Sequence, residues 1–77
     1  MKEIEFIIYV KQKRKEKNIL TKDMAALLNV SPSYYSKIEN NKISLNFSMI
    51  KRISEILDID LNIIKNYDNF NHVVYYD

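Results

Sequence analysis

Three polar residues, Ser33, Ser36 and Lys37, follow Pro32 at spacings that place them on or near one face of a helix. A serine hydroxyl can donate or accept a hydrogen bond, whereas the lysine ammonium group only donates. An α-helix fits the major groove of DNA, where serine can bond to base edges and lysine donates to guanine O6 and N7. These residues are therefore candidates for contacts with base edges. The alternative interpretation is an ordinary solvated helix surface.

Catalytic chemistry is poorly supported by the remaining residues. His72 is the only histidine, and the chain of 77 residues contains neither cysteine nor glycine. This composition argues against thiol nucleophiles, zinc sites and glycine-rich phosphate loops. Asp58 and Asp60 lie close together in the sequence, but carboxylates at a helix end are usually solvated. We expect no enzyme activity, no metal and no cofactor.

A tight turn between two short helices, expected at 21–28 and 32–40, must position the candidate face. Ser31 is a good N-cap residue, and Pro32 suits the first helical position, where its missing N–H costs nothing. The second helix therefore begins about three residues after the first one ends. Such a short connection turns the second helix sharply outward, which is the helix-turn-helix arrangement.

The absence of glycine affects the turns that flank this second helix. A position that requires positive φ must then use the next best residue, which is asparagine. Asn29 stands in the turn between the two helices, and Asn41 follows the second one. We expect both to be left-handed residues that end a helix.

A helix expected at 3–17 supports this unit. Its buried face would carry Phe6, Ile7, Val10 and Arg14, although alternating apolar residues leave a short strand over 2–6 as an alternative. Ile8 and Tyr9 are apolar residues outside this face. They could form extra core or part of a dimer surface, and extra core is the more frequent explanation.

Two more helices are expected toward the C-terminus. Asn46 would cap a helix that ends near Asp58, and residues 61–66 would form a short fifth helix laid on the bundle. The sequence thus predicts an all-α bundle of about five helices. The apolar stripe of the fourth helix, at spacings of three and four, consists of Phe47, Ile50, Ile53 and Leu57.

Charge and composition change along the chain. Residues 1–57 carry 11 basic and 6 acidic side chains, whereas residues 58–77 carry one basic and four acidic ones. This polarity suits a polyanionic partner at one end, with solubility alone as the alternative. We expect a domain at 1–66 and an acidic, aromatic tail at 67–77.

The tail has strand-forming residue types at 72–76. A lone strand is not stable by itself, so the tail could pack on the bundle, pair with its copy in a second subunit, or be a ragged end. We favour a subunit contact.

The cellular compartment can be inferred from what the sequence lacks. Without cysteine there is no disulfide framework. No apolar run approaches the roughly 18 to 20 residues that span a bilayer, and the first residues do not resemble a secretion signal. We expect a cytoplasmic protein that does not insert into membranes.

Residues 10–64 resemble the Cro/CI-type helix-turn-helix family, also called the xenobiotic response element family, whose members are mostly bacterial and phage transcriptional repressors. The resemblance rests on the combined spacing of three segments, VKQKRKEKN, DMAALLNVSPSYYSKIENNK and MIKRISEILDI. It implies a lambda-repressor-like domain that binds double-stranded DNA. The residues in family register are Val10, Arg14, Met24, Ala25, Val30, Tyr35, Ser36, Ile38, Glu39, Ile50, Ile53 and Leu57.

The resemblance also implies roles for individual residues. Arg14 and Glu39 occupy the places of a partly buried ion pair that ties the first helix to the end of the third. The base-reading positions are Pro32, Ser33, Ser36 and Lys37. The phosphate-contacting positions are Thr21, Ser31, Tyr34, Asn40, Lys42 and Ser44.

The chain departs from the family pattern at three places. Leu20 stands where the family usually has a hydroxyl or amide N-cap, and Thr21 stands where it usually has Gln, so Thr21 could itself cap the helix. Leu45 stands where Pro is common, so the loop into the fourth helix could follow a different path.

Two kinds of function are compatible with these features. The first is a dimeric transcriptional regulator, expected to be a repressor, that reads an inverted repeat with one recognition helix per subunit. The second is an antitoxin or antirepressor-like module that keeps the fold but acts on a protein partner through the tail.

Overall fold

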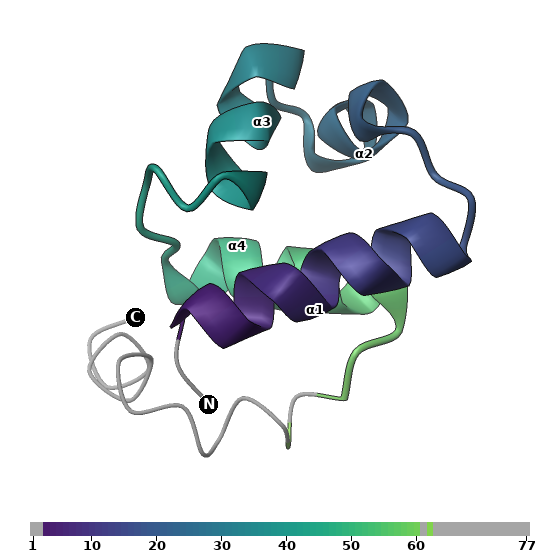
Figure 1. Cartoon of the computed structure of the whole chain (residues 1–77), viewed down its shortest axis with the longest axis vertical. Helices are drawn as coiled ribbons and strands as arrows, with labels where there is room; N and C mark the ends of the chain where they lie inside the picture. The colour runs from purple at the N-terminus through teal and green to yellow at the C-terminus, as the bar shows by residue number, and fades with distance from the viewer. Residues whose placement is uncertain (1–2, 61, 63–77) are drawn as a thin grey trace.

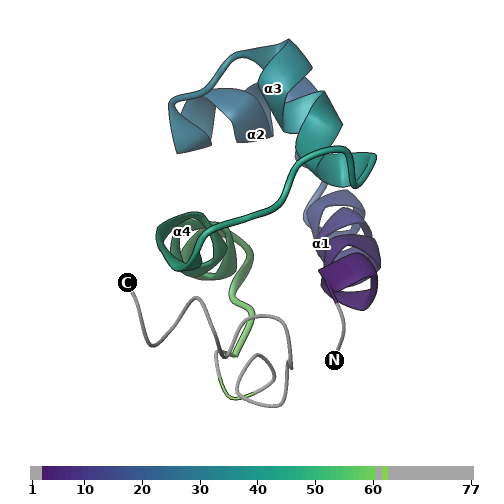
Figure 2. The ribbon, with the colours of Figure 1, turned by 90° about the vertical axis from the view of Figure 1, so that its left-hand side faces the viewer.

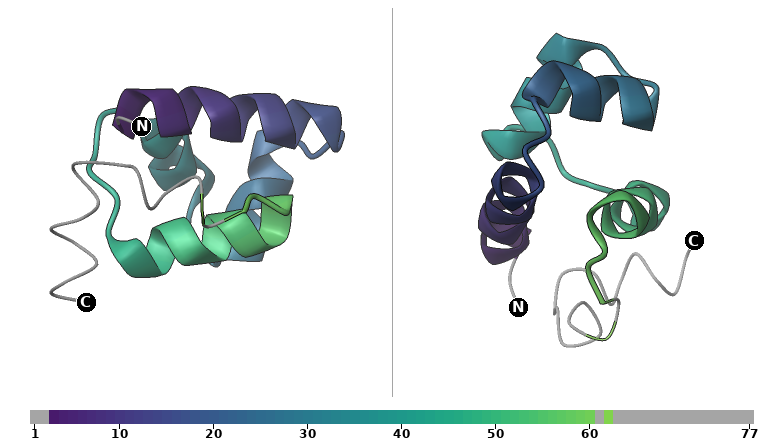
Figure 3. Two further views of the ribbon diagram at one scale, coloured as in Figure 1. Left: turned by 90° about the horizontal axis from the view of Figure 1, so that it is seen from below. Right: turned by 90° about the vertical axis from the view of Figure 1, so that its right-hand side faces the viewer.

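The computed structural model describes residues 3–60 and 62, and this part of the chain forms four α-helices and no strand: α1 (Glu3–Glu16), α2 (Thr21–Leu28), α3 (Pro32–Glu39) and α4 (Phe47–Leu57). Helices α1 and α4 run side by side in the same direction (Figures 1 and 3). Figure 2 shows α2 and α3 together on one side of that pair. None of these helices is long and apolar enough to cross a membrane.

The expected all-α class is confirmed for the described residues. Helices were expected at 21–28 and 32–40 and after Asn46, and each lies within about one residue of its expected ends. Because α1 already begins at Glu3, the alternative of a strand over the first residues is wrong for residues 3–6. Apart from Asn62, the expected fifth helix at 61–66, the strand at 72–76 and the tail at 67–77 lie outside the described residues.

Local capping accounts for the starts of α3 and α4. Ser31 Oγ accepts a hydrogen bond from the Tyr34 N–H at 3.1 Å, and Asn46 Oδ1 accepts one from the Met49 N–H at 2.8 Å. Each bond satisfies a backbone donor that the first turn of a helix leaves unpaired.

Helix α2 begins differently. Leu20 occupies the N-cap in an extended conformation and supplies no side-chain hydrogen bond, while Thr21 is the first helical residue. The expectation that Thr21 could cap α2 is therefore wrong, because an N-cap residue stands just before the first helical residue.

Every described helix is followed within two residues by a left-handed residue other than glycine. The φ values of Asn18, Asn29, Asn41 and Asp58 lie between 56° and 59°. In each case the next residue donates its backbone N–H to a carbonyl five positions earlier, as Val30 does to Ala25 at 3.0 Å. This is the Schellman pattern of helix termination. The expected left-handed conformations of Asn29 and Asn41 are confirmed, and Asn18 and Asp58 were not anticipated.

One hydrophobic core joins all four described helices. Burying such side chains supplies the main favourable free energy of folding. Ile8 and Tyr9 of α1 were both expected to form extra core or part of a dimer surface. Tyr9 packs partly against the core, whereas Ile8 is 58% exposed and is therefore not extra core. The core consists of Phe6, Ile7, Val10, Met24, Ala25, Leu28, Tyr35, Ile38, Leu45, Ile50, Ile53, Leu57 and Ile59.

Two long-range hydrogen bonds fix the connections around α4. The Leu45 N–H donates to Glu3 Oε1 at 3.0 Å, and the Leu45 side chain is buried. A proline at this position could not make that bond, because it has no N–H. Arg52 Nη2 donates to the Leu27 carbonyl at 2.9 Å and so satisfies an acceptor in the last turn of α2.

Candidate nucleic-acid interface

Helix α3 presents one polar face to solvent and one apolar face to the core. Tyr35 and Ile38 are buried. The exposed side carries all four expected base-reading residues, Pro32, Ser33, Ser36 and Lys37. Because the helix starts immediately after the Asn29 turn, its first residues project from the body of the protein (Figures 1 and 2).

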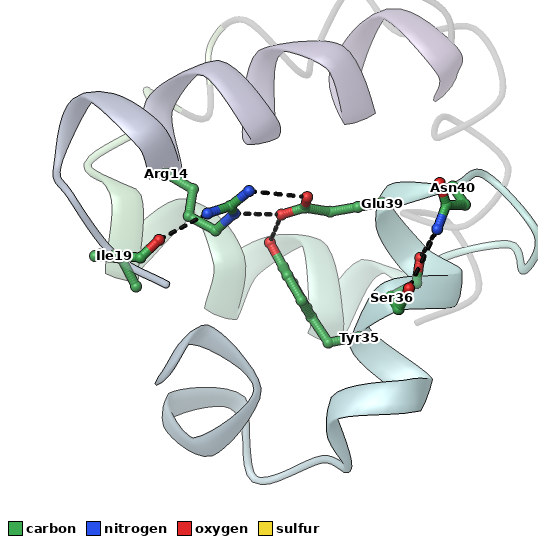
Figure 4. Close-up of polar contacts among 6 residues, drawn as sticks. All are labelled: Arg14, Ile19, Tyr35, Ser36, Glu39 and Asn40. Carbon is green, nitrogen blue, oxygen red and sulfur yellow. Dashed lines mark hydrogen bonds and ion pairs between the residues drawn. The ribbon is translucent and has the colours of Figure 1, made fainter. Parts of the chain in front are cut away.

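A buried polar cluster anchors the C-terminal end of α3 to α1 (Figure 4). Arg14 Nε donates to Glu39 Oε2 at 2.6 Å, and Arg14 Nη2 donates to Glu39 Oε1 at 3.3 Å. Arg14 Nη1 also donates to the Ile19 carbonyl at 2.7 Å, and the Tyr35 hydroxyl donates to Glu39 Oε2. Arg14 is 8% exposed and Glu39 is 7% exposed, so the two members of the expected ion pair meet inside the protein.

The surroundings of this cluster raise the pKa values of Arg14 and Tyr35. The hydrogen bond to Glu39 raises the pKa of Arg14 above its ordinary value, against the opposing effect of burial. Burial raises the pKa of Tyr35 well above its usual value, and the hydrogen bond to Glu39 adds to this effect. Tyr35 therefore keeps its hydroxyl hydrogen and can donate it to the Glu39 carboxylate, which is already paired with Arg14.

A second hydrogen-bonded unit lies on the exposed side of α3. Asn40 Nδ2 donates to the Ser36 carbonyl at 2.8 Å and to Ser36 Oγ at 3.2 Å (Figure 4). The unit joins an expected base-reading residue to an expected phosphate-contacting one. Both residues remain exposed.

The other expected phosphate-contacting residues are also exposed. Ser31 is engaged as the N-cap of α3 and lies 3.4 Å from Ser33, measured between the two Oγ atoms. Tyr34 is 41% exposed. Thr21 opens α2, and Lys42 and Ser44 lie in the loop between α3 and α4.

Comparison with known families agrees with this geometry. A family model described as helix-turn-helix matches residues 10–64, which is well over half of the chain. The chain belongs to the Cro/CI-type helix-turn-helix family. Within it, α2 and α3 are the two helices of the helix-turn-helix, and α1 and α4 support them.

One curated relative of this helix-turn-helix chain comes from Bacillus phage phi105, where it is named "ImmF control region 10 kDa protein". The two sequences are 38% identical over 56 residues, which cover 73% of this chain. The chain spans 62% of the length of that relative. No solved structure was found to match the chain.

Sequence reasoning missed two features of the helix-turn-helix unit. The hydrogen bond from the Tyr35 hydroxyl was not expected, although Tyr35 and Glu39 are four residues apart on one helix. The same spacing separates Ser36 from Asn40. Side chains four residues apart on a helix are neighbours, so this spacing was the signal that could have identified both pairs.

Proposed function

We propose that this chain is a sequence-specific DNA-binding transcription regulator that places α3 in the major groove. The observation that carries the proposal is the exposed face of α3, whose hydrogen-bonding side chains project outward while Arg14 and Glu39 hold its far end to α1. Ser36 and Lys37 are within this face and would contact base edges. Membership of a helix-turn-helix family supports the same conclusion.

The phosphate backbone would be bound by the residues that flank α3. Lys42 supplies a positive charge just after the helix. Thr21 opens α2, and its hydroxyl would donate to a phosphate oxygen at this helix N-terminus, where Leu20 provides no side-chain cap. Tyr34, Ser31 and Ser44 would add neutral contacts.

We further propose that the protein acts as a dimeric repressor on an inverted repeat. A helix of eight residues offers few base contacts, and two copies would increase affinity and double the length of sequence that is read. Two recognition helices in successive major grooves would lie about 34 Å apart. The name of the phage relative, which refers to a control region, is compatible with a regulatory role.

Selection of bound sequences from a random pool of DNA duplexes tests this function. We expect the full chain to enrich two half-sites in inverted orientation, with centres about 10 base pairs apart. Enrichment of one half-site would support DNA reading without dimeric recognition. Equal binding of all sequences would contradict the proposal.

A matched pair of variants links the result to α3. Lys37→Ala and Lys51→Ala remove the same charge, but Lys37 lies on α3 and Lys51 lies on α4. Only Lys37→Ala should change the enriched sequence. A similar change with Lys51→Ala would place the reading surface elsewhere.

A further inference from the structure

The amide orientation of Asn40 is fixed by its neighbour. A backbone carbonyl only accepts hydrogen bonds, so the group that faces the Ser36 carbonyl at 2.8 Å must be the NH₂ end of the amide. The same nitrogen lies 3.2 Å from Ser36 Oγ. Its two hydrogens thus have two acceptors on one residue. The remaining Oδ1 atom is an acceptor, as phosphate oxygens are, and cannot bond to them.

This arrangement also leaves the Ser36 hydroxyl hydrogen available to DNA. Ser36 Oγ accepts from Asn40, and within the described part of the chain its own hydrogen meets no acceptor. The hydroxyl therefore has a hydrogen to donate outward. Lys37, the next residue on the exposed face, can only donate.

We propose that Asn40 is a positioning residue for base recognition, which holds the Ser36 hydroxyl as an outward donor and thereby, with Lys37 beside it, selects guanine. Guanine presents two acceptors, O6 and N7, in the major groove and no donor there. Adenine and cytosine each present an amino donor at this edge, which would face the donors of α3, and thymine presents a single acceptor, O4, so only guanine offers one acceptor to each of the two donors. The inference rests on the proposed DNA-binding function and assigns Asn40 a role other than contact with phosphate.

Base preference, measured position by position, distinguishes the two roles. Sequences are selected from a random duplex pool with the full chain and with the variants Ser36→Ala, Asn40→Ala and both together. We expect a G·C pair at the position where Ser36→Ala relaxes the preference. Asn40→Ala should relax the same position, by between about twofold and about tenfold, as expected for one hydrogen bond. The double variant should lose no more than Ser36→Ala alone, because Asn40 acts only through the Ser36 hydroxyl.

Two controls accompany the measurement. Ser33→Ala removes a neighbouring hydroxyl that Asn40 does not bind, so it should relax a different position. Asn40→Leu keeps roughly the shape of the side chain without its amide and should reproduce Asn40→Ala. Circular dichroism checks that each variant is folded, which we expect because Asn40 is exposed.

Several results would overturn this inference. If Asn40→Ala weakens binding to all sequences equally, or changes nothing, then Asn40 does not position Ser36. An A·T pair at the position relaxed by Ser36→Ala would contradict the selection of guanine. If the unaltered chain enriches no sequence at all, the proposed DNA-binding function fails as well, whereas the other outcomes leave that function intact.

Discussion

Glu39 Oε2 accepts a hydrogen bond from Arg14 Nε at 2.6 Å, although the two residues are 25 positions apart in the sequence. The bond joins the last residue of α3 to α1, and both side chains are almost completely buried. The orientation of the proposed recognition helix is therefore coupled to the core of the protein. Changes to this pair should affect stability first and DNA binding as a consequence.

Arg14→Met should destabilise the protein by about 3–5 kcal/mol, because the carboxylate of Glu39 would be left buried without its charged partner. Urea denaturation followed by circular dichroism measures this loss. Lys17→Ala is the comparison, since it removes the exposed partner of Asp58, an ion pair at 2.8 Å on the surface. A surface pair contributes little, so the two variants should differ clearly. Equal losses would show that burial does not determine the strength of the Arg14 pair.

Tyr35→Phe should cost roughly 1.5–3 kcal/mol, since it removes a hydrogen bond to a charged acceptor. It should also change the dependence of stability on pH. Burial raises the pKa of Tyr35, so above the ordinary tyrosine pKa of about 10 the unfolded chain loses a proton that the folded chain keeps. Stability should therefore fall as the pH rises above about 10, with a slope of up to about 1.4 kcal/mol per pH unit from this residue.

The comparison of the wild type with Tyr35→Phe isolates that effect. The sequence contains six tyrosines, and the other five are present in both proteins. The free energy of unfolding, measured by urea titration from pH 8 to pH 11, should decline less steeply in the variant. Parallel curves would exclude a linkage through Tyr35.

Ser54→Ala should leave the protein as stable as before or make it more stable by about 1 kcal/mol. Ser54 is 2% exposed, and its hydroxyl has no hydrogen-bond partner within the described part of the chain. Removing an unsatisfied buried polar group avoids the cost of its desolvation. Thermal unfolding measures the effect, and Ser48→Ala, at an exposed position of the same helix, controls for the change from serine to alanine. A clear loss of stability with Ser54→Ala alone would mean that this hydroxyl is hydrogen-bonded.

Asn29→Ala should destabilise the protein by about 1–2 kcal/mol, because alanine adopts the left-handed conformation much less readily than asparagine. Asn29→Gly should be tolerated, since glycine has no Cβ to clash in this conformation. Chemical denaturation of the two variants provides the test. If they are equally stable, the backbone at this turn does not require a left-handed residue.

Lys37→Ala and Lys42→Ala should weaken DNA binding in different ways. Lys37 is expected to contact a base, so its loss should cost on the order of 1–3 kcal/mol on the selected site and relax sequence choice. Lys42 is expected to contact phosphate, so its loss should weaken binding to all sequences and reduce the salt slope by about one. Binding measured at several salt concentrations on selected and scrambled duplexes separates the two effects. A uniform loss with Lys37→Ala would place Lys37 among the phosphate contacts.

The parts of the fold that sequence predicted well depend on local chemistry. Ser31, Pro32 and Asn46 act within one helical turn of their own positions, and a cap residue can be recognised without knowledge of the rest of the chain. The left-handed Asn29 and Asn41 follow from the absence of glycine.

Features that depend on tertiary packing were harder to predict. The bond from the Leu45 N–H to Glu3 joins residues 42 positions apart, and nothing in the sequence near Leu45 indicates it. The exposure of Ile8 likewise depends on which neighbours cover α1, because its apolar type alone favours burial. For the candidate site, residue types indicated which side chains could contact DNA, whereas the partner of Asn40 decides what its amide can still bind.

The left-handed residues that end the four described helices, none of which is glycine, also affect the entropy of the unfolded chain. Glycine has more conformational freedom than any other residue, and a chain without it gains less backbone entropy when it unfolds. Asparagine and aspartate at these positions raise the free energy of the folded state, but they also keep the denatured ensemble smaller. Introducing glycine at all four positions would lower the free energy of the folded state, but it would also increase the entropy of the unfolded chain. The two changes would therefore have opposite effects on stability. A helical domain can therefore dispense with glycine without a large net change in stability.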